Sequence, residues 1–146
     1  MSIEDDVALL ERVPTLRLLG TTALRMLAIG SEQRDIARGD LLFSAGDKAD
    51  AGFIVQRGAF RVDDGGAEIV AGPGALIGEL ALVVAMQRPA TATAIDRSSV
   101  IRIARSLFQR VLESDPAAAR RLRDEFASRT SQITSDIVMA GAKLSI

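Results

Sequence analysis

Residues 2–30 carry apolar side chains at helical spacing. The spacing is close to the 3.6-residue period of an α-helix at Val7, Leu10 and Val13. Ser2 is a suitable N-cap because Asp5 follows three residues later, as in a capping box. A second helix is predicted from residue 21 or 22 to residue 30. The chain therefore opens with helices.

The pattern changes at residue 31 to short β-prone segments separated by glycines. Strands are predicted at 33–37, 40–43, 52–57, 59–63, 67–71, 91–95 and 99–104. Short strands at such close spacing are typical of a small barrel or a jelly roll. The sequence predicts an α+β fold in one domain, 1–146. A glycine-punctuated antiparallel, jelly-roll-like β-roll (31–104) is flanked by N-terminal helices (1–30) and C-terminal helices (105–146).

Helical spacing returns after Arg105. Ser106 is predicted to cap a helix ending near Ser114, and Asp115 and Pro116 to begin a long helix reaching about Gly141. One face of this helix repeats every three or four residues, at Leu122, Phe126, Arg129, Ile133, Ile137, Ala140 and Leu144. Such a face either forms the seam of a homodimer or packs on the β-roll.

Composition narrows the classes of function. The chain has 146 residues, 48% of them hydrophobic, and a net charge of −1, which gives no reason to expect nucleic acid or anionic membrane as a partner. It has no cysteine and no histidine, so thiolate metal sites, imidazole-ligated metal and a histidine general base are excluded. The acidic N-terminus lacks the features of a signal peptide, and no apolar run could span a bilayer. We expect a cytoplasmic protein with no membrane segment.

Residues 77–94 contain the most distinctive chemistry. Gly78 and Glu79 open a short helix-forming run from Leu80 to Met86, and Arg88 follows just before a β-prone segment. Amides at a helix start attract an anion, and an arginine can grip two phosphate oxygens. A glutamate can accept a hydrogen bond from a ribose hydroxyl. Taken singly, Glu79 suits a first helical turn and Arg88 a solvated loop, but together they suit a phosphorylated sugar.

The order of elements and several short phrases resemble one known family. The phrases are residues 38–43, 45–47, 53–58, 72–74 and 78–79, which lead into the 77–94 segment. They are similar to the cyclic nucleotide-binding domain found in catabolite activator proteins, protein kinase A regulatory subunits and cyclic nucleotide-gated channels. The resemblance covers nearly the whole chain, and 77–94 corresponds to the family's phosphate-binding cassette.

The resemblance implies a role for each cassette residue. Glu79 takes the ribose 2′-hydroxyl, Arg88 neutralises the cyclic phosphate, and the remaining phosphate and ribose contacts come from Gly78, Leu80, Ala81, Pro89 and Ala90. Pro89 departs from the family, which usually has alanine, serine or threonine there. Proline has no N–H to donate to the phosphate and no hydroxyl to offer a guanine. We therefore expect cAMP rather than cGMP, with reduced affinity, and no cofactor beyond this ligand.

Base contacts are expected from two other segments. Ile69 and Val70, just before the cassette, are candidates for the apolar wall beside the base. Residues 133–136 resemble the segment of catabolite-activator-type proteins whose Thr-Ser pair meets the adenine. By that local match Thr134 and Ser135 are further candidates.

Two functions remain open from the sequence. The favoured one is a non-enzymatic sensor in which cyclic nucleotide binding moves the C-terminal helices. The alternative is a protein-interaction or oligomerisation module with a degenerate pocket, in which Pro89 marks lost binding. The basic residues 120–123 are interpreted as a solvated helix face, and no DNA-binding segment is expected in this chain.

Overall fold

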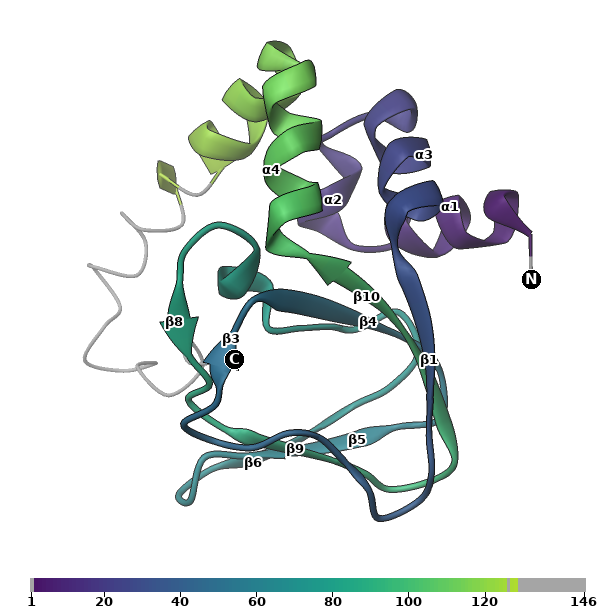
Figure 1. Ribbon diagram of the computed structural model, residues 1–146, viewed down its shortest axis with the longest axis vertical. Helices are drawn as coiled ribbons and strands as arrows, with labels where there is room; N and C mark the ends of the chain where they lie inside the picture. Colours follow the sequence, from purple (N-terminus) through teal and green to yellow (C-terminus); the bar gives the residue numbers. More distant parts are fainter. Residues whose placement is uncertain (1, 126, 129–146) are drawn as a thin grey trace.

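The chain folds as two layers, a β-roll and a group of helices packed over one of its sheets (Figure 1). The computed structural model describes residues 2–125 and 127–128. The helices are α1 (Ile3–Glu11), α2 (Pro14–Arg17), α3 (Thr21–Gly30) and α4 (Arg105–Ser114), with a 3₁₀ turn η1 (Glu79–Leu82). The strands are β1 (Glu32–Ile36), β2 (Leu41–Phe43), β3 (Lys48–Ala49), β4 (Ala51–Arg57), β5 (Phe60–Asp63), β6 (Glu68–Ala71), β7 (Leu76–Ile77), β8 (Met86–Gln87), β9 (Thr91–Ala94) and β10 (Ser98–Ala104).

Two four-stranded antiparallel sheets form the roll. Sheet A has the order β1-β10-β4-β7 and lies next to the helices, whereas sheet B has the order β2-β9-β5-β6 and lies on the far side (Figure 1). A small third sheet pairs β3 with β8. The prediction of an α+β fold is confirmed: along the chain, an antiparallel roll follows the N-terminal helices and precedes the C-terminal ones.

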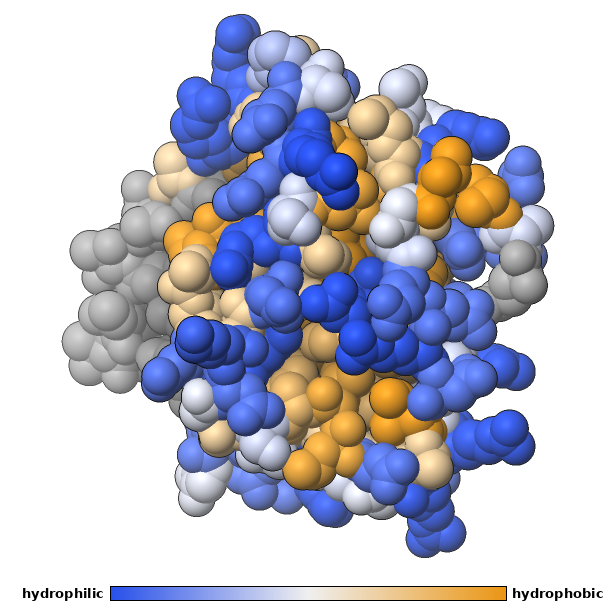
Figure 2. Space-filling model, viewed as in Figure 1, coloured by the Kyte–Doolittle hydropathy of each residue, from blue (hydrophilic) through white to orange (hydrophobic). Residues whose placement is uncertain are grey.

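Sheet A separates two hydrophobic cores. Alternate residues of β4 point to opposite sides, so Ile54 packs with the helices while Phe53 and Val55 pack inside the roll. We call these the helical core and the roll core. On the surface, Figure 2 shows a mainly hydrophilic face with apolar residues exposed in its lower half and at its upper right.

The first helix begins as predicted. The Ser2 hydroxyl accepts a hydrogen bond from the Asp5 amide at 3.2 Å, and the Asp5 carboxylate accepts one from the Ser2 amide at 3.4 Å. Together these bonds satisfy two amides that the helix itself leaves unpaired. The helix at 21–30 is also confirmed, whereas α2, a single turn with Pro14 at its start, was not predicted.

Two local predictions were wrong. The run from Leu80 to Met86 is not one helix: it forms only the turn η1, and Met86 already belongs to β8. Ser106 does not cap α4, which starts one residue earlier with Ala104 at the N-cap and without a side-chain capping bond. The short strands β3, β7 and β8 were not predicted either. A further helix does follow Pro116 and covers 116–125, but its predicted end near Gly141 lies outside the described residues.

One glycine shows how tightly the roll is turned. Gly58, between β4 and β5, has φ of 83°, and a Cβ at this position would collide with the Ser98 side chain and the Arg97 carbonyl. The Ser98 hydroxyl instead accepts a hydrogen bond from the Ala59 amide at 3.2 Å. Only glycine fits this contact between two turns.

Candidate ligand site

A small pocket lies inside the roll against the 77–94 segment. Six of the seven predicted cassette residues line it, namely Gly78, Leu80, Ala81, Arg88, Pro89 and Ala90. The rest of the lining is apolar and comes from Phe43, Val62, Ile77 and Met86.

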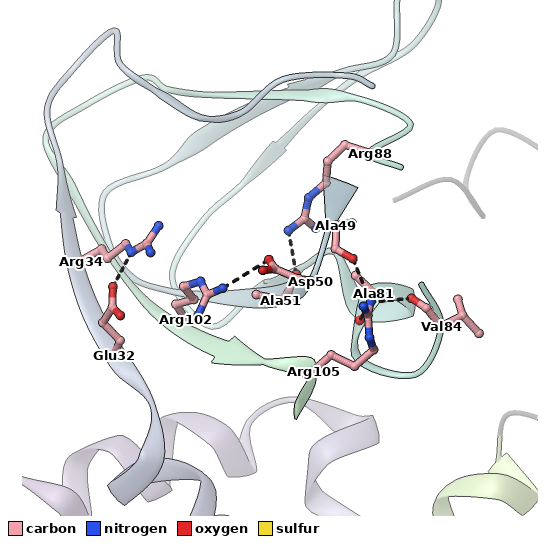
Figure 3. Close-up of polar contacts among 10 residues, drawn as sticks. All are labelled: Glu32, Arg34, Ala49, Asp50, Ala51, Ala81, Val84, Arg88, Arg102 and Arg105. Atoms are coloured by element: carbon pink, nitrogen blue, oxygen red, sulfur yellow. Dashed lines mark hydrogen bonds and ion pairs between the residues drawn. The ribbon is translucent and has the colours of Figure 1, made fainter. Parts of the chain in front are cut away.

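Arg88 is the charged group of this pocket. Its side chain is only 5% exposed, and its Nη2 donates a hydrogen bond to the Ala51 carbonyl at 2.8 Å (Figure 3). The guanidinium carbon lies 4.2 Å from the centre of the Phe43 ring and 5.4 Å from that of Phe53. Both aromatic faces therefore stabilise the cation.

The surroundings leave the charge of Arg88 incompletely compensated. Its buried Nε has no hydrogen-bond partner among the described residues. Burial lowers the pKa of Arg88, and Arg102 lowers it further, whereas the carboxylates of Asp50 and Asp47 act in the opposite direction. Asp50 forms an ion pair with Arg102, at 3.2 Å, rather than with Arg88 (Figure 3). A buried cation with an unused donor is suited to receive an anion.

Gly78 makes room for this arginine. It has φ of 78° at the start of η1, and a Cβ on it would lie 2.5 Å from Nη1 of Arg88. The backbone of Arg88 is held on both sides by the loop after β2. Its amide donates to the Asp47 carbonyl at 2.7 Å, and its carbonyl accepts from the Gly46 amide at 2.8 Å. The guanidinium is thereby fixed against the turn whose amides were predicted to face the ligand.

Those amides are partly engaged. The Ala81 amide donates to the Gly78 carbonyl at 3.1 Å, which is the 3₁₀ bond of η1 itself. A ligand that uses the Ala81 amide must therefore share or replace this bond.

Glu79 differs from its neighbours in direction. Its Oε1 accepts a hydrogen bond from the Thr15 hydroxyl at 2.7 Å, and Glu79 is absent from the pocket lining. Thr15 belongs to α2 and is 2% exposed. The carboxylate predicted to bind ribose therefore contacts the helical layer in this structure.

Arg105 is a cassette contact that the sequence did not predict. Its Nη1 donates to three carbonyls, those of Ala49 at 2.8 Å, Val84 at 3.0 Å and Ala81 at 3.2 Å (Figure 3). It is also the first residue of α4, where the helix dipole disfavours a cation. That unfavourable position is the one signal in the sequence that could have indicated a special role.

Comparison with known proteins identifies the family of this chain. The family model for the cyclic nucleotide-binding domain matches residues 33–115, more than half of the chain. The chain belongs to the cyclic nucleotide-binding domain family. The 77–94 cassette lies within the matched segment and supplies most of the residues that line the pocket.

Relatives and solved structures agree with this membership. The chain is 33% identical over 105 residues to the cAMP-dependent protein kinase regulatory subunit of Eremothecium gossypii, covering 70% of this chain and 23% of that protein. It is 34% identical to a cyclic nucleotide-binding-like protein from Brucella abortus, with a TM-score of 0.66 and coverage of 75% and 98%. The N-terminal domain of a Streptomyces coelicolor transcriptional regulator is 28% identical, with a TM-score of 0.78 and coverage of 87% and 95%. The chain spans about a quarter or less of the curated relatives it matches.

The base-contact candidates of this cyclic nucleotide-binding domain are placed differently from one another. Ile69 pairs with Val62, which lines the pocket, so Ile69 lies on the pocket side of β6. Val70 pairs with Arg61 and lies on the opposite face, away from the pocket. Thr134 and Ser135 lie outside the described residues.

Of the positions predicted to form a dimer seam, the structure describes one, Leu122. Leu122 is buried in the helical core and therefore packs within its own chain, whereas the dimer seam stays a prediction. The other seam positions, from Phe126 to Leu144, lie outside the described residues.

Among the residues that are described, no helix has the length and apolar character needed to cross a membrane.

Proposed function

We propose that this domain is a non-enzymatic sensor that binds a cyclic nucleotide in the roll pocket. The observation that carries the proposal is Arg88, a buried guanidinium with an unused Nε donor inside an otherwise apolar pocket. A singly charged cyclic phosphate would compensate this cation and accept its hydrogen bonds. Family membership supports the same ligand class.

The remaining contacts follow from the cassette. We propose that the amides of Gly78, Ala81 and Ala90, three residues that line the pocket with Arg88, face the phosphate. Glu79 would bind the ribose 2′-hydroxyl after turning away from Thr15. The ligand itself completes the site, and we propose no further cofactor.

We propose a preference for cAMP over cGMP. Pro89 lines the pocket and offers neither an N–H nor a hydroxyl, so it cannot donate to a guanine. Ile69, on the pocket side of β6, suits the apolar wall beside an adenine, and we keep Thr134 and Ser135 as candidate base contacts.

Binding is proposed to act on the C-terminal helices. Arg105 bonds the exit of η1 through Ala81 and Val84 and at the same time begins α4, so a shift of the cassette would be passed to that helix. The ligand can move α4 only by as much as its affinity differs between the two arrangements. We further propose a homodimer through the C-terminal helix and a cytoplasmic location.

Calorimetric titration with cAMP and cGMP tests the function. We expect micromolar or tighter binding of cAMP and weaker binding of cGMP, and adenosine 5′-monophosphate provides a control without the cyclic phosphate. Absence of binding up to millimolar concentration would favour the alternative, an interaction module with a degenerate pocket. That alternative has support from Pro89 and from the direction of Glu79.

A further inference from the structure

Glu79 is the cassette residue whose carboxylate is turned out of the pocket. The residues on either side of it, Gly78 and Leu80, line the pocket, whereas Glu79 receives the Thr15 hydroxyl at 2.7 Å. A hydroxyl that donates to a carboxylate at this distance makes a strong, charge-assisted hydrogen bond. The two residues are 64 positions apart in the chain, so the bond joins the cassette to the N-terminal helices.

Thr15 is well fixed for this contact. It is 2% exposed and sits in α2, whose φ is set at the start by Pro14. Leu16 and Leu19, which follow it in the chain, are fully buried in the helical core. Glu79, by contrast, is partly exposed and carries a flexible side chain. When the bond breaks, Glu79 is therefore the side chain that turns.

We propose that Thr15 is a positioning residue that holds Glu79 in a retracted orientation, and that the ligand's 2′-hydroxyl must take the carboxylate from it. This inference rests on the proposed function, since it assigns Glu79 to the ribose. Thr15 and the ribose hydroxyl both donate, and they compete for the same carboxylate. Thr15 therefore lowers the affinity for a ribose ligand. Binding of the ligand in turn breaks the hydrogen bond between α2 and η1.

Linkage gives this competition a measurable size. If the retracted orientation dominates, the apparent affinity is reduced by the fraction of molecules in which Glu79 is available. Binding of the ligand must weaken the contact between α2 and η1 to the same extent, because coupling is reciprocal. A ligand that lacks the 2′-hydroxyl should not bind more tightly when the Thr15 hydroxyl is removed, and it should not break the bond between Thr15 and Glu79.

The test compares the full chain with Thr15→Val, which keeps the shape but removes the hydroxyl, and Thr15→Ser, which keeps the hydroxyl. Each protein is titrated with cAMP and with 2′-deoxy-cAMP. Thr15→Val should bind cAMP about tenfold more tightly, the effect expected from removing one hydrogen bond to a charged group. Its affinity for the deoxy ligand should stay within about twofold of wild type. Thr15→Ser should resemble wild type with both ligands.

Two results would overturn the proposal. Weaker binding of cAMP alone by Thr15→Val would mean that Thr15 presents Glu79 to the ribose instead of withholding it. Equal changes for cAMP and 2′-deoxy-cAMP would mean that the substitution acts on the fold. Circular dichroism and thermal unfolding identify a variant that fails to fold, in which case Thr15→Ala replaces Thr15→Val.

Hydrogen exchange separates failure of this inference from failure of the proposed function. Wild-type protein that binds no cAMP refutes the proposed function alone. The role of Thr15 is then tested without ligand. Amides at residues 78–84 should exchange faster in Thr15→Val than in wild type, and Thr15→Ser should restore the slower rate. Identical exchange in all three proteins overturns the role of Thr15 as the group that holds Glu79.

Discussion

The two cores on either side of sheet A are built from different side chains. The helical core is filled by large aliphatic residues, among them Leu10, Leu24 and Leu27. The roll core contains many alanines, at 51, 71, 90, 92 and 94, and Arg88 lies beside them. Among the described residues Arg88 is the only buried side chain that carries a charge.

This contrast separates stability from function. Large side chains that interdigitate give the helical core its dispersion and hydrophobic energy. The alanines of the roll core leave room beside the buried cation, which itself packs against the rings of Phe43 and Phe53. We therefore expect substitutions in the helical core to change unfolding and substitutions in the roll pocket to change binding.

The largest effect is expected from Leu24→Ala in the helical core. Leu24 is fully buried, so its truncation should lower the free energy of unfolding by about 2–5 kcal/mol, from lost transfer energy and the cavity left behind. Urea denaturation measures this loss. Leu41→Ala is the matched control, since Leu41 is 52% exposed on β2 and should cost no more than about 0.5 kcal/mol. Similar losses in both variants would mean that burial in the helical core does not set the loss of stability.

Arg88→Met should do the reverse. Removal of the buried cation should weaken cAMP binding by about 2–5 kcal/mol, the range for breaking a desolvated charge pair. The free energy of unfolding should stay the same or rise, because an incompletely compensated charge is replaced by an apolar side chain. Arg61→Met, at an exposed position of β5, is the control and should leave binding unchanged. A marked loss of stability in Arg88→Met would mean that the arginine supports the roll itself.

A smaller effect is expected at Pro89. Pro89→Ala restores a backbone N–H at the pocket and should leave cAMP affinity equal or improve it, by at most about 1.5 kcal/mol. Pro89→Thr adds a hydroxyl and should raise cGMP binding relative to cAMP. Calorimetry of both variants with both nucleotides measures the change. Tighter cAMP binding by wild type than by Pro89→Ala would show that the rigid proline ring shapes the pocket.

The smallest effect is expected where the helical layer meets sheet A. Burial raises the pKa of Asp6, and Asp5 adds to the rise; the Asp6 carboxylate accepts a hydrogen bond from Gln56 at 3.5 Å. The folded state then binds the proton more tightly than the unfolded state, so stability falls as pH rises above the ordinary Asp pKa. Asp6→Asn should therefore stabilise the protein at pH 7, by less than about 0.5 kcal/mol. Urea titrations across the acid range should show this gain disappearing as the pH falls.

The sequence predicted the parts of the fold that have a period. Helices at 3–11 and 21–30 and the longer strands repeat their apolar residues often enough to be recognised. Strands of two residues, such as β3 and β7, have no period, and they form because a neighbouring strand supplies the partners. Arg105 begins α4 against the helix dipole because its side chain contacts three carbonyls that lie far away in the chain.

The site was predictable to the same degree. The spacing of the cassette residues placed Gly78, Arg88 and Ala90 around one pocket, because they lie close together on one short segment of the chain. The direction of Glu79 depends on Thr15, which packing of α2 brings near, and no local pattern contains that information. The two neighbours Ile69 and Val70 show the limit most simply, since the pleat sends one toward the pocket and the other away.

Strand β4 has a consequence for how this domain can be altered. Its consecutive residues Phe53, Ile54 and Val55 belong in turn to the roll core, the helical core and the roll core. One residue inserted before Phe53 would reverse the alternation of side chains along the strand. Ile54 would then point into the roll core, and the phenyl ring of Phe53 would point toward the helices. By contrast, the exposed turn at Gly65 and Gly66 projects from the roll and touches neither core. Insertions such as a reporter peptide or a fluorescent protein belong in that turn, and β4 must keep its length.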